Sequence, residues 1–362
     1  MGVVETAAGI SFSLVAGVAV DSFNRRRLMI LSDVVRGAAL VFLVGYLLLT
    51  GFNLLVILIV GFIIASFSVL FQPSENAVMP EIVGGANVSK ANGLVRSSRS
   101  IATMVGDGIA GVMIVTIGAI VGLAYNSITF FASAILIAAV ATGIGKSRPK
   151  SKDHKSSYFG DLKEGFAWLK SNKGLLELTG SAFFLNFFFS MAVTYMVVFV
   201  TRGLNEGGLT FGIVLALTSL GEASGALSVG RVGAARYAGK AWTLGYGMTC
   251  GTFLLIMAVF ANVYVTGFCA LLIGFFAAFG GTAWLSAAQI MVPSEMQGRY
   301  FGIDQLGSIA ILPVAQIAGA LIINSLGILH GFEIAALGMI MSAAGFIALA
   351  DLRNLRAIPP NE

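Results

Sequence analysis

The chain has 362 residues, of which 57% are hydrophobic and only 11% are charged, and its net charge is +5. A soluble domain carries about 25% charged residues, so this composition excludes a water-soluble enzyme, and it equally excludes a disordered chain, which needs a polar sequence. The apolar runs are long and unbroken, which excludes a transmembrane β-barrel. The predicted fold class is an all-α membrane protein that crosses the bilayer many times.

Eleven segments reach the length of about 20 apolar residues that a helix needs to cross a bilayer. In chain order they cover residues 2–20, 28–49, 54–71, 94–116, 120–144, 175–200, 209–230, 241–261, 265–287, 301–325 and 332–350. We expect the first five to form an N-terminal bundle over 1–145 and the last six a C-terminal bundle over 175–351. A linker over 146–174 separates the bundles, and 352–362 forms a tail.

Basic residues mark one side of these spans. Of the 22 Lys and Arg residues, all except Arg202 fall on the same side when the connections are counted alternately, and the richest are the triplet Arg25-Arg26-Arg27 and the stretch 145–174. The positive-inside rule makes this side cytoplasmic. The linker, the tail and the C-terminus are therefore expected in the cytoplasm, and the protein in the inner or plasma membrane of the cell.

The linker 146–174 is the one sizeable polar stretch. Its apolar residues Phe159, Leu162, Phe166 and Leu169 have helical spacing, which predicts a short amphipathic helix on the inner membrane face, in contact with anionic lipid. A linker that only sets topology is favoured over a regulatory segment.

Short matches indicate that the chain contains two copies of a unit about 210 residues long. Ile109-Ala110-Gly111 recurs as Ile317-Ala318-Gly319, and Met79-Pro80-Glu81 has a counterpart in Val292-Pro293-Ser294-Glu295. In this register, the partner of the span at 175 would begin about 35 residues before Met1. The pattern predicts a helix ahead of the first span, through a truncated start or a late start codon. A genuine eleven-span protein is the alternative.

The stretch Gly17-Val-Ala-Val-Asp21-Ser-Phe-Asn-Arg25-Arg26-Arg27 resembles the cytoplasmic signature loop of the major facilitator superfamily. Leu31-Ser-Asp33-Val-Val-Arg36 resembles the branch that contains macrolide-efflux and enterobactin-export proteins, and so do Phe71-Gln72-Pro73 and Asn126-Ser-Ile-Thr-Phe130. The resemblance implies two pseudo-symmetric helical bundles and makes the first span the family's second helix. Asp107 departs from the family pattern, because it stands where the fifth helix has a Pro.

By this resemblance, a set of inner charges latches the cytoplasmic ends of the bundles together. The latch residues are Gly17, Asp21, Arg25, Asp33, Arg36 and Arg99. Asp33 and Arg36 are three residues apart on one helix and can pair. For Arg26 and Arg27, a role in topology alone is favoured.

Two acidic residues lie deep within predicted spans. A charge at a helix centre costs at least about 2.5–3.5 kcal/mol, so Asp107 and Glu222 are candidate proton carriers. A desolvated carboxylate has a pKa raised toward neutrality, which suits a group that loads and releases a proton. The alternative is a structural role, with each carboxylate hydrogen-bonded to a neighbouring helix.

A polar stripe recurs every four residues in the span at 175–200 and consists of Asn186, Ser190 and Thr194. It lies among aromatic residues that include Phe183 and Phe187, a combination that suits an amphipathic ligand, although some of these rings must face lipid. Weaker candidates for the substrate cavity are Asn126, Trp284, Gln305 and Gln316.

The sequence therefore predicts a secondary active transporter that exports a small amphipathic or lipophilic compound, drug-like or siderophore-like, in exchange for protons by alternating access. Its expected partners are a small-molecule substrate, protons and membrane lipids, and it is expected to be monomeric. We expect no enzymatic activity, cofactor, metal site or nucleic-acid binding. The alternatives are an uptake carrier or uniporter on the same fold, a channel, and a non-transporting truncated remnant.

Overall fold

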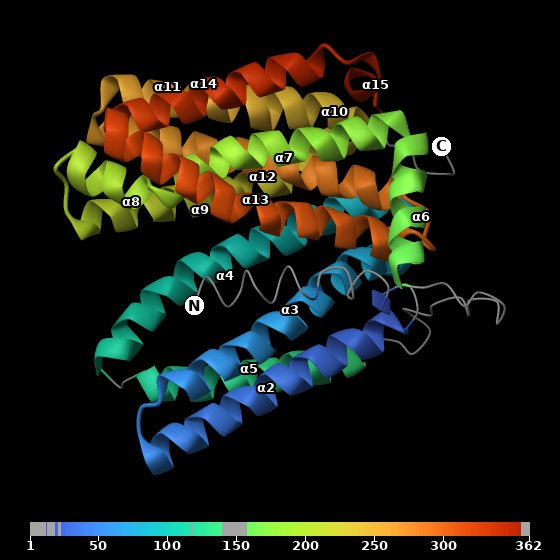
Figure 1. The fold of residues 1–362 in the computed structure, drawn as a ribbon, viewed down its shortest axis with the longest axis vertical. Helices are drawn as coiled ribbons and strands as arrows, with labels where there is room; N and C mark the ends of the chain where they lie inside the picture. The colour runs from blue at the N-terminus through green and yellow to red at the C-terminus, as the bar shows by residue number, and fades with distance from the viewer. Residues whose placement is uncertain (1–11, 13–18, 21–22, 117–118, 140–157, 356–362) are drawn as a thin grey trace. The chain divides into compact units, whose positions relative to one another are not determined.

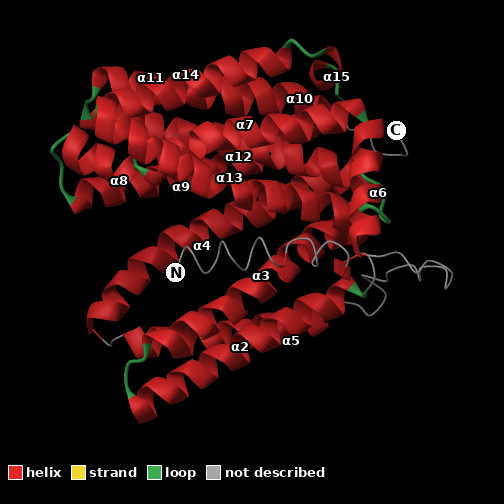
Figure 2. Ribbon diagram, viewed as in Figure 1, coloured by secondary structure: helices red, strands yellow, loops and turns green. Residues whose placement is uncertain are grey.

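The computed structural model describes residues 12, 19–20, 23–116, 119–139 and 158–355. In this part of the chain every regular element is a helix, and Figure 2 shows no strand among the described residues. The predicted first span lies almost wholly outside them, as do Gly17 and Asp21 of the predicted latch.

The main helices carry the labels of Figure 1. They are α2 (Arg25–Thr50), α3 (Leu54–Val83), α4 (Val88–Thr116), α5 (Ala119–Ala139), α6 (Tyr158–Ser171), α7 (Lys173–Thr194), α9 (Gly208–Val232), α11 (Thr249–Phe260), α12 (Val263–Met291), α13 (Gln297–Leu326) and α14 (Ile328–Ile347). Short elements extend or join them: η1 (Gly85–Asn87), α8 (Met196–Val198), η2 (Phe199–Gly203), η3 (Ala234–Tyr237), α10 (Ala238–Lys240), η4 (Ala241–Met248) and α15 (Ala350–Arg353).

Nine helices in the described residues are long and apolar enough to cross a membrane. Each overlaps one of the predicted spans, which confirms the all-α membrane fold. The predicted span 94–116 falls within α4, which is not among the nine, so the expected count of eleven spans stays a prediction.

Asparagine side chains begin two of these helices. The side chain of Asn24 accepts a hydrogen bond from the backbone N–H of Arg27 at the start of α2, and Asn53 does the same for Leu55 and Val56 at the start of α3. Each cap satisfies backbone donors that have no partner inside the helix. Between α2 and α3 the chain turns at Gly51, whose φ of +83° favours glycine.

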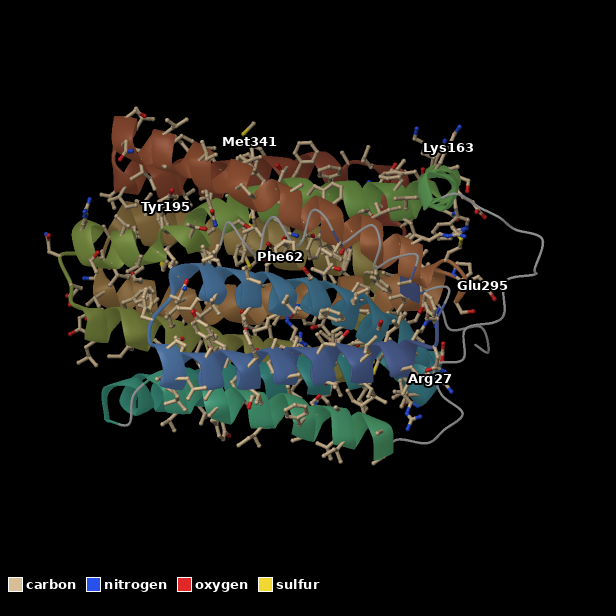
Figure 3. All side chains as sticks on the ribbon, turned by 60° about the horizontal axis from the view of Figure 1, so that its bottom comes forward. Arg27, Phe62, Lys163, Tyr195, Glu295 and Met341 are labelled. Atoms are coloured by element: carbon tan, nitrogen blue, oxygen red, sulfur yellow. The ribbon has the colours of Figure 1, made fainter. Side chains whose placement is uncertain are left out.

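The chain divides into two compact units, of which the first comprises Met1–Gly84, Gly106–Leu169 and Val292–Ile309. In this unit α2 packs against both α3 and α5 (Figure 1). Figure 3 shows Arg27, Lys163 and Glu295 near one end of the unit, the end that the distribution of basic residues predicts to be cytoplasmic.

The second unit comprises Gly85–Val105, Lys170–Met291 and Ala310–Glu362. Its closest helix pair is α9 with α12. A Cβ atom at Gly221 would lie 2.0 Å from the carbonyl oxygen of Leu271, and one at Gly225 would lie 2.0 Å from that of Phe275. The four-residue spacing of small residues in α9 thus serves direct backbone contact. Gly106 of α4, which belongs to the first unit, has no such neighbour, since nothing in the described part of the chain lies within 4 Å of a Cβ placed there.

Candidate functional site

Arg25 connects three segments of the first unit. Its side chain, which is 5% exposed, forms an ion pair with Glu81 near the end of α3. It also donates hydrogen bonds to the carbonyl oxygens of Ala77, at 3.2 Å, and of Ser294, at 2.6 Å. Ser294 precedes α13, so a single guanidinium holds the start of α2 to both the end of α3 and the segment ahead of α13. All of these contacts lie within the first unit, and the latch role of Arg25 stays a prediction.

A second charged cluster lies inside the first unit, where Arg36 forms an ion pair with Asp33. The hydroxyl of Ser133 in α5 donates to the other carboxylate oxygen of Asp33 at 2.6 Å. The Arg36 guanidinium lies between two rings, 4.7 Å from the centroid of Phe71 and 4.6 Å from that of Phe130. It also donates to the hydroxyl of Ser68 at 3.3 Å. Both charges are therefore buried and fully partnered between α2, α3 and α5.

In the second unit, α4 presents a polar stripe that consists of Asn92, Arg96 and Ser100. The spacing of four residues places them on one helix face. Asn92 donates to Ser286 at 3.0 Å and to Gln289 at 2.5 Å, both in α12. Ser100 donates to one carboxylate oxygen of Glu222 in α9 at 3.0 Å. Arg99, predicted as a latch residue, lies on the exposed side of α4.

Arg96 itself has no hydrogen bond or ion pair within the part of the chain that the structure describes. One guanidinium nitrogen lies 2.7 Å from the position that a Cβ atom of Gly281 would occupy. The carboxylate of Glu222 attracts its positive charge. A glycine in α12 thus makes room for a cation that faces a carboxylate without touching it.

Aromatic side chains of η4, α7 and α12 form a cluster in the second unit. The rings of Trp242 and Tyr246 lie 4.5 Å apart, and Phe189 meets Tyr246 edge-on at 5.3 Å. The Tyr246 hydroxyl donates to Asn186 at 2.9 Å. Trp284 lies 6.0 Å from Trp242, and its indole N–H is buried without a partner among the described residues. Two predicted cavity residues, Asn186 and Trp284, therefore belong to this aromatic cluster.

The other predicted cavity residues are more scattered. In α7, Phe183, Phe187 and Ser190 are half-buried, and Thr194 is exposed at the end of the helix. Asn126 in α5 and Gln316 in α13 are exposed, and Gln305 belongs to the first unit. Asp107 lies in α4, but its side chain is outside the described set. Their assignment to a substrate cavity stays a prediction.

Sequence reasoning missed Arg96, Ser100 and Tyr246 as site residues. The i, i+4, i+8 spacing of Asn92, Arg96 and Ser100 was a readable signal, because it places three polar side chains on one face of a spanning helix. It also missed Asp304, a half-buried acid in α13 with no hydrogen bond or ion pair inside the described ranges.

Comparison of the sequence with known proteins shows which family the chain belongs to. The sequence model of the Major Facilitator Superfamily matches residues 1–308. The chain belongs to the major facilitator superfamily. This superfamily consists of membrane transporters, as the resemblance of the signature loop implied.

Two relatives of this superfamily member carry the names of an efflux pump and of a putative exporter. It is 29% identical over 187 residues to the multidrug efflux pump Tap of Mycobacterium tuberculosis, a match covering 48% of this chain and 43% of the relative. It is 24% identical over 294 residues to the putative bacilysin exporter BacE of Bacillus subtilis, covering 80% and 71%. The matched part thus spans less than half the length of the mycobacterial pump.

The fold has a close match among solved structures. The human organic anion transporter MFSD10 superposes with a TM-score of 0.76 at 15% identity, covering 95% of this chain and 83% of the transporter. At this identity the likeness concerns the fold alone.

Proposed function

We propose that this protein exports a small amphipathic compound across the cell membrane in exchange for protons, with Glu222 as a proton carrier. The observation that carries the proposal is the setting of Glu222 in the second unit. It lies near the middle of α9, is half-buried, and accepts one hydrogen bond from Ser100 while facing Arg96. The names of the two sequence relatives support export as the direction.

The chemistry follows from the charge of the carboxylate. A carboxylate within a membrane helix is costly when charged, and protonation removes that cost. The Ser100 hydroxyl both donates and accepts, so it stays bonded to Glu222 in either protonation state. The bond from Ser100 joins α4 to α9 at Glu222, so loading this carboxylate with a proton shifts the balance between conformations.

Asp107 is the second proposed carrier, on the ground of its position within α4. A polar residue inside a spanning helix of a transporter marks a functional site by default.

The test is transport into inside-out proteoliposomes under an imposed pH gradient, with a panel made of a lipophilic cation, a lipophilic acid and a hydrophobic dipeptide. We expect accumulation of at least one compound to follow the gradient in the natural protein. Glu222→Gln should retain exchange of that compound between the two sides but lose the response to the gradient.

The matched control is Glu206→Gln. Glu206 lies ahead of α9 and accepts a hydrogen bond from Thr210 at 2.9 Å, which a glutamine oxygen can also accept. This variant should keep the response to pH. If Glu222→Gln and Asp107→Asn together leave accumulation as dependent on the gradient as in the natural protein, the proposal is wrong.

A further inference from the structure

Arg96, Trp284 and Glu222 are among the polar groups of the second unit that lack part of their bonding within the described residues. The guanidinium of Arg96 makes no hydrogen bond in the described residues, and the indole N–H of Trp284 is buried without a partner there. Glu222 accepts one bond, at Oε2, and its other oxygen accepts none from the described chain. Arg96 and Glu222 are half-buried, so their open bonding positions are accessible to a ligand. The buried indole N–H of Trp284 costs about 1–3 kcal/mol while it stays unsatisfied.

We infer that Arg96 and Glu222 form a dipolar binding site for a zwitterionic substrate, whose carboxylate binds Arg96 and whose ammonium group binds Glu222. The inference rests on the proposed function and adds the chemical class of the substrate.

The balance of charge selects a zwitterion over a ligand with one charge. A cationic ligand at Glu222 would leave Arg96 without its counter-charge, and an arginine does not lose its proton. An anionic ligand at Arg96 would require Glu222 to carry its proton, and such a ligand would not compete with that proton. A ligand that carries both charges compensates both groups at once.

The positions of Arg96 and Ser100 along α4 give only the scale of the separation between the ligand's two charges. Arg96 and Ser100 are one turn apart on α4, about 6 Å along the helix axis, and Ser100 holds Glu222. Two extended residues span about 6.6–7 Å. The ends of a dipeptide therefore match this spacing, whereas the charges of a single amino acid are closer together.

The neighbouring rings determine what the rest of the ligand can be. Trp242 and Trp284 lie 6.0 Å apart, and Trp242 stacks near Tyr246 at 4.5 Å. Gly280 and Gly281 link the two parts of the site, because the first contacts Tyr246 and the second contacts Arg96. Apolar side chains of a short peptide suit such an aromatic surface. At Glu222, the ammonium group of the ligand competes with a proton, as an exchanger requires.

Binding to the purified protein in lipid nanodiscs tests the site. The chain has three tryptophans, so in a Trp168→Phe background the fluorescence reports Trp242 and Trp284. The probes are leucyl-leucine, its N-acetyl derivative, its amide, the doubly blocked form, and free leucine. We expect leucyl-leucine to bind at least about tenfold more tightly than any of the others.

The variants should change which probe is preferred. Arg96→Gln should bind the dipeptide amide as well as the dipeptide, because the carboxylate has lost its partner. Glu222→Gln should bind the N-acetyl dipeptide as well as the dipeptide. Arg96→Lys should restore part of the preference for a free carboxylate. Arg231→Gln, which removes an exposed cation at the end of α9, should behave as the natural protein.

Three results would overturn the inference: no binding of leucyl-leucine to the natural protein, no preference among the probes, or an Arg96→Gln variant that weakens all probes by the same factor. The proposed function survives these results if Glu222→Gln still abolishes the response of transport to a pH gradient. Conversely, suppose that the protein prefers leucyl-leucine over its blocked forms but that a pH gradient drives no transport. The binding site would then be supported, and the proposed exchange with protons would be wrong.

Discussion

Each unit holds an arginine and an acidic residue within its helices, and the two pairs differ in how closely they contact each other and their neighbours. In the first unit, Arg36 and Asp33 form an ion pair, Ser133 bonds to Asp33, and two aromatic rings lie beside Arg36. In the second unit, Arg96 faces Glu222 without contact, and only Ser100 bonds to the carboxylate.

This difference separates a charge that holds helices together from a charge that is available to a ligand. The Arg36 cluster is satisfied within the bundle of α2, α3 and α5, so we expect it to stabilise the first unit rather than to latch two bundles. Arg96 and Glu222 have fewer such contacts among the described residues, and ionisable groups within membrane helices mark functional sites.

The largest effect is expected from Asp33→Asn, which leaves the Arg36 guanidinium buried without its counter-charge. Breaking a buried pair costs about 3–5 kcal/mol, so the apparent melting temperature should fall by roughly 10 °C. Thermal unfolding followed by gel filtration measures it. The double variant Asp33→Leu with Arg36→Met should recover most of the loss, and Arg27→Gln, on the exposed side of α2, should change nothing. An equally stable Asp33→Asn protein would contradict the structural role.

The second prediction tests whether Arg96 and Glu222 lack partners because the second unit is loosely packed. In a closely packed unit, Gly225→Ala is destabilising, because its Cβ would lie 2.0 Å from the carbonyl oxygen of Phe275. Overpacking of this kind costs about 1–3 kcal/mol. The matched control is Gly106→Ala, which meets nothing within 4 Å in the described chain and gains about 1 kcal/mol of helix propensity. The two variants should shift the melting temperature in opposite directions, and equal shifts would mean that α9 and α12 are not closely packed.

The sequence alone predicts the helices well, because hydropathy determines them. The pairing of Asp33 with Arg36 follows from their spacing of three residues, but the bond from Ser133 does not, since the two residues are a hundred positions apart and meet only through helix packing. From the sequence, the positive-inside rule alone accounts for Arg96, because it accounts for any cation near a helix end. The position of its guanidinium depends on Gly281, a residue of another helix that makes room for it.

A smaller effect is expected where α6 meets α13. Arg299 forms an ion pair with Glu164 at 3.1 Å, but the Glu164 side chain is 56% exposed. An exposed pair contributes about 0–1 kcal/mol, so Glu164→Gln should move the melting temperature by no more than about 3 °C. Gly165→Leu should do more, because a Cβ at Gly165 already lies 3.2 Å from Ile303. A large loss in Glu164→Gln alone would show that charge, not packing, holds α6.

The smallest effect on stability is expected for Arg96→Gln. This variant also tests most directly whether Arg96 differs from Arg36. The substitution removes a cation that makes no hydrogen bond in the described residues, and it relieves the cost of burying that cation. The attraction to Glu222 is lost at the same time, so the two changes oppose each other and the melting temperature should stay within about 2 °C of the natural protein. Arg36→Gln is the matched comparison on the other unit and should be strongly destabilising, since it removes the partner of buried Asp33. If both arginine variants lose stability equally, Arg96 is a structural residue like Arg36, and its charge is not free to meet a ligand.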